Sequence, residues 1–375
     1  MIHFVYAVPT SPTIAGRIRQ RAILAAQRAR IPVSYVGRRE GVSSAAWPNR
    51  APASITAHVY GALRARAKTR LYDVREHALI RGGADDVLIG HYLAGDSSGV
   101  WQRSCRDGRF AVRIAMNPLH HQMPEVCGEL DPYIPMVDRI FGIMGSYWYD
   151  TWPQSALGHW FPKIVPFDMA IDLAAFPRLK ARFNPPGRRR FLYIGWAGAQ
   201  KGTHLLSILF GLTKRHTCVA IGPSRPLPNV ECRPRVLFTL PYLQRLAAEC
   251  DFLLAPGVSD ANPTVILEAM AWGFPVACTP QSGYSGMAEL LPLSITDMRH
   301  NLAMLDMLQE AREEDLLARA DAARALVATR YTWERFETNL YGALNEAMIE
   351  KGLRPLSGGD EPPDRSLAGE SAQHT

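Results

Sequence analysis

Two acidic residues in the second half of the chain, Asp260 and Glu268, have the spacing of a ligand site. The apolar run Phe252–Ala255 predicts a buried strand. A helix is expected from Pro263, because proline suits a first helical turn whose N–H groups lack partners. The free amides of such a turn and the helix dipole together favour a bound phosphate. Glu268 lies a little over one turn beyond Thr264 and can reach the same ligand, so the segment predicts a site for an anionic, hydroxyl-bearing ligand.

A second candidate is a cation that follows a strand and a glycine turn. Phe191–Ile194 predicts a strand, and Gly195 and Lys201-Gly202 follow it before the next helix. A lysine at the start of a helix supplies a compact positive charge for a diphosphate. The alternative is an ordinary solvated lysine, just as Asp260 could merely cap its loop and Glu268 could be a solvated helical carboxylate.

The segment from Asp260 to Val276 resembles the family 4-like (group 1) glycosyltransferases of the GT-B fold. Their mark is two acidic residues separated by seven others, then Ala-Met-Ala, one residue, Gly, one residue and Pro-Val. This chain has Asp260 and Glu268 at that spacing, followed by Ala269-Met270-Ala271-Trp272-Gly273-Phe274-Pro275-Val276. The family usually has glutamate at the first acidic position, so Asp260 shortens the reach by one methylene.

Other segments add to the resemblance. Gly195 and Lys201-Gly202 match the family's pattern of Gly-Arg, several residues and Lys-Gly, but Trp196 replaces the arginine, which removes one of two cations expected at the diphosphate. Met169–Pro177 is similar to the family's crossover element. Tyr331–Glu334 is similar to the start of its C-terminal helix.

The resemblance implies a role for each site residue. Glu268 would accept hydrogen bonds from the donor's ribose, Asp260 would stabilise an oxocarbenium-like sugar, and Lys201 would balance the leaving diphosphate. His91, after the expected strand Val87–Gly90, would orient the transferring sugar, although a histidine at a strand end is more often structural. His120 and His121 are weaker candidates of the same kind. The implied donor-binding set is Gly195, Trp196, Lys201, Asn262, Pro263, Thr264, Val265 and Glu268.

The implied reaction is a retaining transfer without an essential metal. No two aspartates in the chain are separated by a single residue, so the usual carboxylate pair for a diphosphate-bound metal is missing. Charge neutralisation would then come from Lys201 and helix amides. The expected co-substrate is a UDP- or GDP-linked sugar, with no other cofactor. The Trp196 departure keeps a non-catalytic nucleotide-sugar binder open as the alternative.

Alternating strands and helices in both halves predict an α/β protein with two Rossmann-like domains facing a central cleft. The first half is expected to contain strands at Ile2–Val8 and Val33–Val36 and a basic helix at Ala15–Arg30. The expected domains are 1–172 for the acceptor and 173–350 for the nucleotide sugar, followed by a disordered tail, 351–375. The turn-rich stretch Asn184–Arg190 has the composition of a linker.

The charge of the chain is unevenly distributed. Of its 42 Lys+Arg and 35 Asp+Glu residues, residues 1–190 hold 26 and 14, a balance of +12, whereas residues 191–375 hold 16 and 21, a balance of −5. A basic half can attract a lipid-linked or glycan acceptor, an anionic membrane surface or nucleic acid, although solvated arginines explain it equally well. No nucleic-acid recognition motif is present, so nucleic acid is the least favoured partner. The Gly195–Gly198 segment fails the glycine spacing of a dinucleotide-binding dehydrogenase.

Cysteine usage and the first residues favour a cytoplasmic protein that could lie at the inner face of a membrane. The six cysteines form no CxxC pair, which argues for a reducing compartment. The first eight residues are too short an apolar run, without a basic leader, for a signal peptide.

Overall fold

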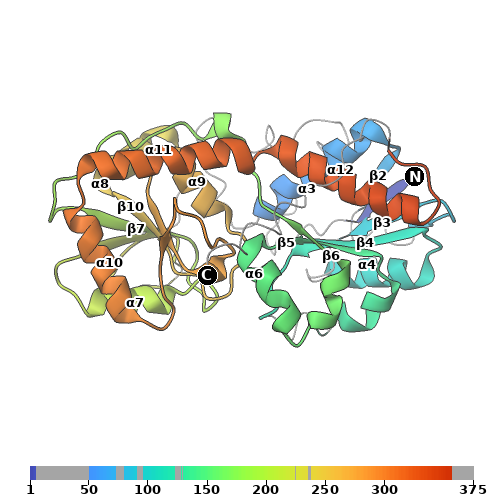
Figure 1. The fold of residues 1–375 in the computed structure, drawn as a ribbon, viewed down its shortest axis with the longest axis horizontal. Coiled ribbons are helices and arrows are strands. Elements are labelled where there is room, and N and C mark those ends of the chain that lie inside the picture. The colour runs from blue at the N-terminus through green and yellow to red at the C-terminus, as the bar shows by residue number, and fades with distance from the viewer. Residues whose placement is uncertain are drawn as a thin grey trace.

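The computed structural model describes residues 1–5, 50–72, 80–90, 96–122, 128, 130–223, 225–234 and 238–356. These residues form two lobes that lie side by side, each built around a six-stranded sheet (Figure 1). The strand orders are β2-β1-β3-β4-β5-β6 and β12-β11-β10-β7-β8-β9, and neighbouring strands pair in parallel in both sheets. The expected α/β class with two Rossmann-like domains is confirmed.

The first lobe is formed by residues from β1 to β6. Its elements are β1 Ile2–Val5, α3 Arg50–Arg66, β2 Thr69–Tyr72, β3 Val87–Gly90, α4 Asp96–Asp107, β4 Val112–Pro118, β5 Arg139–Ile143, α6 Gly145–Thr151 and β6 Ile164–Phe167, with 3-10 turns at Asp131–Met136, Trp152–Gln154 and Gly158–Lys163. Strands β1 and β3 are buried along their whole length, as expected for parallel strands covered on both faces. The helix expected at 15–30, the strand expected at 33–36 and His91 lie outside the described residues.

The second lobe repeats the alternation. Its elements are β7 Arg190–Ile194, α7 Thr203–Gly211, β8 Thr217–Ile221, β9 Glu231–Arg233, α8 Leu240–Glu249, β10 Phe252–Ala255, α9 Thr264–Trp272, β11 Val276–Cys278, β12 Leu291–Pro292, α10 Met298–Glu310, α11 Glu313–Arg330 and α12 Trp333–Glu350, with 3-10 turns at Leu173–Ala175 and Pro280–Ser282. The expected strand 252–255 and helix 264–272 coincide with β10 and α9.

The last helix returns to the first lobe. α11 runs along the second lobe, and α12 continues across the first (Figure 1). α12 begins at Trp333, within the segment that is similar to the start of the family's C-terminal helix, and the Thr332 side chain caps it. The Tyr341 hydroxyl donates to the Ala62 carbonyl oxygen at 2.9 Å, and Lys351 forms an ion pair with Asp138 at 2.8 Å. Residues 333–350, which the sequence assigns to the second domain, therefore pack on the first.

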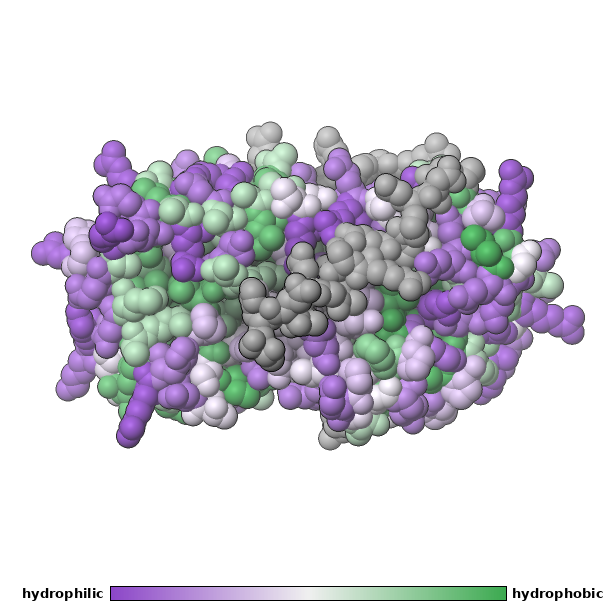
Figure 2. Space-filling model, in the orientation of Figure 1, coloured by the Kyte–Doolittle hydropathy of each residue, from purple (hydrophilic) through white to green (hydrophobic). Residues whose placement is uncertain are grey.

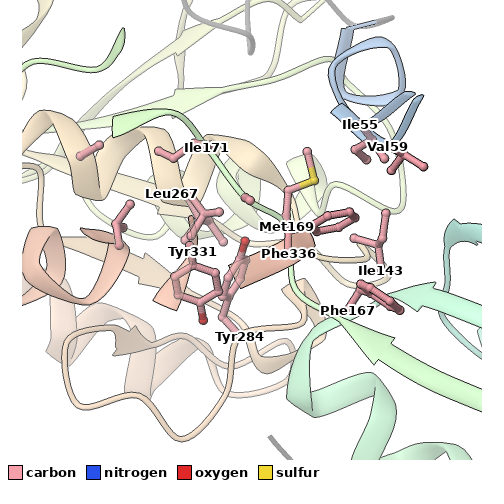
Figure 3. Close-up of a cluster of buried hydrophobic side chains, with 14 of the residues drawn as sticks. Ile55, Val59, Ile143, Phe167, Met169, Ile171, Leu267, Tyr284, Tyr331 and Phe336 are labelled. Atoms are coloured by element: carbon pink, nitrogen blue, oxygen red, sulfur yellow. The ribbon is translucent and has the colours of Figure 1, made fainter. Parts of the chain in front are cut away.

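A continuous hydrophobic cluster joins the lobes at the crossover segment. Figure 3 shows Met169 of this segment between Phe167, which ends β6, and Leu267 of α9, with Ile171 beside Leu267. The Ile171 amide also donates to the Tyr331 carbonyl oxygen at 3.0 Å. Because α9 shares this core with the first lobe, the helix that carries Glu268 is held in place from both sides.

The stretch Asn184–Arg190 is turn-rich, as expected, but it is anchored inside the second lobe. Arg189 is only 2% exposed, and its guanidinium donates to the carbonyl oxygens of Leu308 and Ala311, each at 2.7 Å. The chain instead passes between the sheets near Met169–Ile171. Guanidinium bonds to helix-end carbonyls make this segment part of the second domain's frame.

Residues 351–356, which the sequence placed in a disordered tail, are packed in this structure. Residues 351–356 pack against α12, because Leu356 is 8% exposed and its amide donates to the Asn345 side chain at 2.7 Å. An apolar residue six positions beyond the helix extends the folded part of the chain. Residues 357–375 lie outside the described residues.

The surface in Figure 2 carries hydrophilic residues around its outline, with smaller groups of hydrophobic residues between them. Among the helices that the structure describes, none is long and apolar enough to span a bilayer. The five cysteines in the described ranges are free thiols.

Candidate functional site

Lys201 and Asp260 form an ion pair at the carboxyl ends of the neighbouring strands β7 and β10. The Lys201 Nζ lies 2.6 Å from Asp260 Oδ2, and the two side chains are 24% and 16% exposed. The Gln200 carbonyl oxygen accepts hydrogen bonds from the amides of Val258 and Ser259, at 2.9 and 3.2 Å. These bonds tie the loop after β7 to the loop after β10, so two residues 59 positions apart meet at one point.

Gly202 allows this close approach of the two loops. It precedes α7 in a left-handed conformation with φ of 65°, which glycine adopts without a steric penalty. A Cβ atom at this position would overlap the Pro256 carbonyl oxygen. The Lys-Gly pair of the sequence pattern is therefore a cation followed by the residue that brings the two loops together.

The N-terminus of α9 lies shortly after Asp260 in the chain. Pro263 precedes the helix, no side chain caps it, and its first turn contains no acidic residue. Thr264 and Val265, the first two helical residues, are partly exposed. The first turn of α9 thus contributes no carboxylate of its own that would compete with an anion at this helix N-terminus.

Asn262, which the sequence placed in the donor-binding set, is directed toward the crossover segment. Its Oδ1 accepts hydrogen bonds from the Met169 amide and the Tyr284 hydroxyl, both at 2.9 Å, and its φ of 55° is left-handed. Its side chain is 3% exposed. Asn262 therefore shapes the turn before α9, and a direct contact with the donor stays a prediction.

Glu268 lies on α9 and is fully buried in this structure. Its position on the helix, one turn beyond the N-terminus, is the one expected from the sequence. A ligand can reach its carboxylate only after the surrounding contacts open.

Gly195 and Trp196 follow β7. The Gly195 amide donates to the Ile221 carbonyl oxygen at 3.0 Å, which extends the pairing of β7 with β8. The Trp196 ring is 37% exposed and covers Gly198, the residue whose carbonyl oxygen accepts from the Lys201 amide at 3.2 Å. An exposed aromatic ring thus borders the lysine where the family pattern has a cation.

The first lobe completes the site with His120 and Trp148. The Trp148 Nε1 donates to the Asp260 carbonyl oxygen at 3.2 Å, and His120 Nδ1 lies 3.2 Å from the Ser259 hydroxyl. Burial lowers the pKa of His120 to about 4, although Asp260 opposes the shift; His121 and Lys201 lower it further. His120 is therefore a neutral imidazole at pH 7.

Further contacts hold the two lobes together around this site. The Tyr147 hydroxyl accepts from Gln281 Nε2 at 3.1 Å, and the Ser146 and Ser285 hydroxyls lie 3.2 Å apart. Gly145, with φ of 70°, begins α6, and a Cβ there would overlap the Gly283 carbonyl oxygen. The N-terminus of α6 is thus seated on the loop that follows β11.

The sequence ranked His120 low and did not single out Trp148. A signal was present for His120, since it follows the buried strand Val112–Pro118 at the edge where parallel sheets bind ligands. Trp148 carried no such signal, because only the packing of α6 against the second lobe brings it to Asp260. Among the described residues, no group of three or more His, Cys, Asp or Glu side chains could hold a metal ion.

Solved structures of other proteins share this two-lobed architecture. HepE from Anabaena, crystallised in complex with UDP-glucose, matches with a TM-score of 0.60 and 12% identity over 92% of this chain and 100% of that one. A UDP-forming trehalose-phosphate synthase from Burkholderia xenovorans matches with a TM-score of 0.57 and 11% identity, over 92% and 99% of the two chains. The chain has the GT-B fold.

More distant in coverage is the sucrose-phosphate synthase from Thermosynechococcus elongatus, with a TM-score of 0.53 and 15% identity over 70% of this chain and 74% of that one. No family model and no curated protein sequence matches the chain. In this GT-B chain, the Lys201–Asp260 pair belongs to the second lobe and faces His120 and Trp148 of the first.

Proposed function

We propose that the chain is a retaining glycosyltransferase that moves a sugar from a nucleotide-sugar donor to an acceptor hydroxyl without an essential metal. The observation that carries the proposal is the Lys201–Asp260 ion pair beside the uncapped N-terminus of α9, between the lobes of a GT-B fold. A cation, a carboxylate and free helix amides are the groups that a sugar diphosphate needs. HepE, which shares the fold, is a protein crystallised with such a donor.

The leaving diphosphate is assigned to Lys201 and the amides of Thr264 and Val265. Negative charge grows on the bridging oxygen as the glycosidic bond breaks, and preorganised donors stabilise that charge most in a site shielded from water. Lys201 is three-quarters buried, so its charge is only weakly screened. The released diphosphate then takes the proton of the acceptor hydroxyl on the same face of the sugar.

The sugar is assigned to Asp260 and His120. The Asp260 carboxylate stabilises the positive charge that develops at the anomeric carbon. A neutral His120 imidazole at the same point can donate to or accept from a sugar hydroxyl without adding a charge that would oppose the oxocarbenium ion. Glu268 receives the ribose hydroxyls once donor entry has uncovered it.

The first lobe is assigned to the acceptor. Residues 1–172 hold 20 Lys+Arg and 14 Asp+Glu, a balance of +6. This excess fits an acceptor that is a lipid-linked or polysaccharide intermediate carrying phosphate, and peripheral contact with an anionic membrane surface in the cytoplasm. Polysaccharide biosynthesis is the pathway class that supplies such acceptors.

A second candidate is a GT-B protein that binds nucleotide sugars without turning them over. Trp196 favours it, because this residue stands at the sequence position where the family pattern has an arginine expected to balance the diphosphate. Binding would then be retained, while charge stabilisation in the transition state would be too weak for transfer.

The deciding experiment measures the melting temperature of the full chain with UDP-, GDP- and ADP-sugars, together with slow hydrolysis of each donor. Glu268→Ala is the site variant, and Arg299→Ala, an exposed change on α10, is the control. Stabilisation by one donor class, lost in Glu268→Ala only, with hydrolysis, is the expected result. Stabilisation without hydrolysis favours the second candidate, and no stabilisation by any donor contradicts both.

A further inference from the structure

A basic pocket lies on the first lobe at the sheet edge opposite the ion pair. Its walls come from residues 80–82, which precede β3, and from residues 103–109, which end α4 and lead into β4. The cavity volume is about 260 Å³. His120 and Trp148 follow the carboxyl ends of β4 and β5, whereas this pocket lies at the amino ends of β3 and β4, so it is separate from the site described above.

Three arginines line this pocket: Arg81, Arg103 and Arg109. All three are exposed, and none forms an ion pair with a carboxylate in the part of the chain that the structure describes. The acidic residue of the lining, Asp107, is held by the neighbouring Arg106, whose Nε lies 2.7 Å from its Oδ1. The lining therefore contains three arginines against one aspartate, a net charge of +2.

The pocket wall formed by residues 103–109 is held by a fourth, partly buried arginine. The Arg113 guanidinium donates to the carbonyl oxygens of Cys105, Phe110 and Gly108, each at 3.0 Å. These bonds occupy carbonyls at the end of α4 whose partial negative charge would otherwise repel an anion. The loop is thus held rigid before a ligand arrives, which lowers the entropy cost of binding.

The packing of Phe110 adds to this rigidity. Its ring lies directly against Gly82 and Gly108, so that a Cβ at either glycine would overlap it. The ring joins the two segments that form the pocket walls. Ser104, 7% exposed, lines the same cavity and adds a hydroxyl group.

We propose that this pocket binds a phosphate monoester group. Guanidinium groups recognise phosphate by paired, charge-assisted hydrogen bonds, and several of them around one cavity match a doubly charged anion better than a single carboxylate. The phosphate can belong to a soluble phosphorylated metabolite or to the headgroup of an anionic lipid. The site is independent of the donor site and of the transferase reaction.

The test titrates inorganic phosphate into the full-length protein by calorimetry. Arg103→Gln/Arg109→Gln removes two guanidinium groups from the pocket. Arg188→Gln/Arg299→Gln is the matched control, because it makes the same charge change at two exposed arginines of the second lobe. A phosphate bound at the donor site would be common to both variants, so the difference between them reports on the pocket. The pocket variant is expected to weaken phosphate binding at least ~10-fold, and the control less than ~2-fold.

Two further arms identify the source of the phosphate. Arg103→Lys/Arg109→Lys keeps the charge but loses the paired geometry, and an intermediate affinity is expected. Co-sedimentation is measured with phosphatidylcholine vesicles that contain or lack phosphatidic acid. If only the vesicles with phosphatidic acid bind the wild type, and the pocket variant loses this binding, the site is assigned to a lipid headgroup. Phosphate binding without vesicle binding assigns it to a soluble ester. Equal phosphate affinity in the pocket and control variants, or no binding in the wild type, overturns the proposal.

Discussion

The Lys201 ammonium and the Asp260 carboxylate neutralise each other while no donor is bound. Under the proposed function, a diphosphate that binds beside α9 is expected to compete with Asp260 for the lysine and to leave the carboxylate facing the sugar. The two members of the ion pair would then take separate roles in the reaction.

Replacing Lys201 by alanine should reduce turnover more than donor binding. The charge that it balances is largest in the transition state, so kcat is expected to fall ~10²-fold or more, with a smaller change in donor Kd. Steady-state kinetics and donor titration by calorimetry measure the two quantities. Arg188→Ala, an exposed cation on the same lobe, should change neither, and a wild-type kcat in Lys201→Ala would show that the cation lies outside the reaction.

Glu268→Gln should have the opposite profile. The amide keeps the volume of a side chain that is fully buried, but it loses the charge that strengthens hydrogen bonds from ribose hydroxyls. Donor Kd is expected to rise ~10-fold with a smaller effect on kcat at saturating donor. Unchanged affinity for every donor would place the ribose elsewhere.

His120 should make stability depend on pH. Its pKa of about 4 lies below the ordinary value of 6.5, so the unfolded chain takes up a proton first as the pH falls. Stability is complete above pH 6.5 and is lost between pH 6.5 and 4, by roughly 3 kcal/mol in all.

Urea unfolding of the wild type and His120→Gln at pH 7 and pH 4.5 measures this contribution. The variant should lose less free energy of unfolding than the wild type over that interval. His204→Gln, at an exposed position on α7, should behave as the wild type. The same loss in His120→Gln as in the wild type would show that another group titrates.

At the scale of elements, a buried ion pair attaches the segment before β7 to the second sheet. Lys180 and Asp251 are 2% and 0% exposed, with 2.8 Å between the ammonium and the carboxylate. The lysine also donates to the carbonyl oxygens of Ala247 and Cys250, which end α8. Asp251 accepts from the Arg190 amide at 3.0 Å, so one carboxylate joins the end of α8 to the start of β7.

Lys180→Met should destabilise the protein by about 3–5 kcal/mol, because the Asp251 carboxylate would remain buried without its counter-charge. Chemical denaturation measures the free energy of unfolding. The double variant Lys180→Met/Asp251→Asn should recover part of the loss, since it removes the unpaired charge. A double variant less stable than Lys180→Met would indicate that the hydrogen bonds of Asp251, rather than its charge, dominate.

At the scale of the molecule, the site exists only where the lobes touch. Trp148 reaches Asp260, and α6 is seated on the loop after β11, yet Glu268 is buried in the same arrangement. The two lobes also share one hydrophobic cluster at Met169–Ile171, so both the contacts around the site and the core beside it are built from both lobes.

Gly145→Ala should hold the lobes apart at the site. The added methyl would overlap the Gly283 carbonyl oxygen, and φ of 70° is strained for alanine. A displacement of about 1 Å can cost ~10²-fold in rate, so kcat/KM should fall ~10- to 100-fold. The melting temperature should change little. Small-angle scattering should show a larger radius of gyration; Gly61→Ala, on an open face of α3, is the control. Wild-type kcat/KM in Gly145→Ala would show that this contact is not needed for chemistry.

Local patterns accounted for much of the second lobe. β10 and α9 fall where the apolar run 252–255 and Pro263 place them, and the two acidic residues occupy the expected loop and helix. The local signal was weaker at Asn184–Arg190, where turn residues hid the buried Arg189, and at residues 351–356, where one apolar residue extends the packed chain. The carbonyl partners of Arg189 lie 119 and 122 positions away, and the partner of the Leu356 amide lies 11 positions away on α12, so no pattern within either short segment could reveal them.

By itself, the sequence determined the two-domain α/β architecture and the types of group at the site, because periodicity, helix-start chemistry and motif spacing are properties of short segments. Only the tertiary structure decided that Lys201 meets Asp260, that His120 is buried and neutral, and that Trp148 crosses from one lobe to the other. The first fact depends on β7 and β10, whose carboxyl ends lie side by side at one edge of the sheet. The other two depend on how the two lobes pack. Long-range contacts set burial and charge, and burial and charge set what the site residues can do.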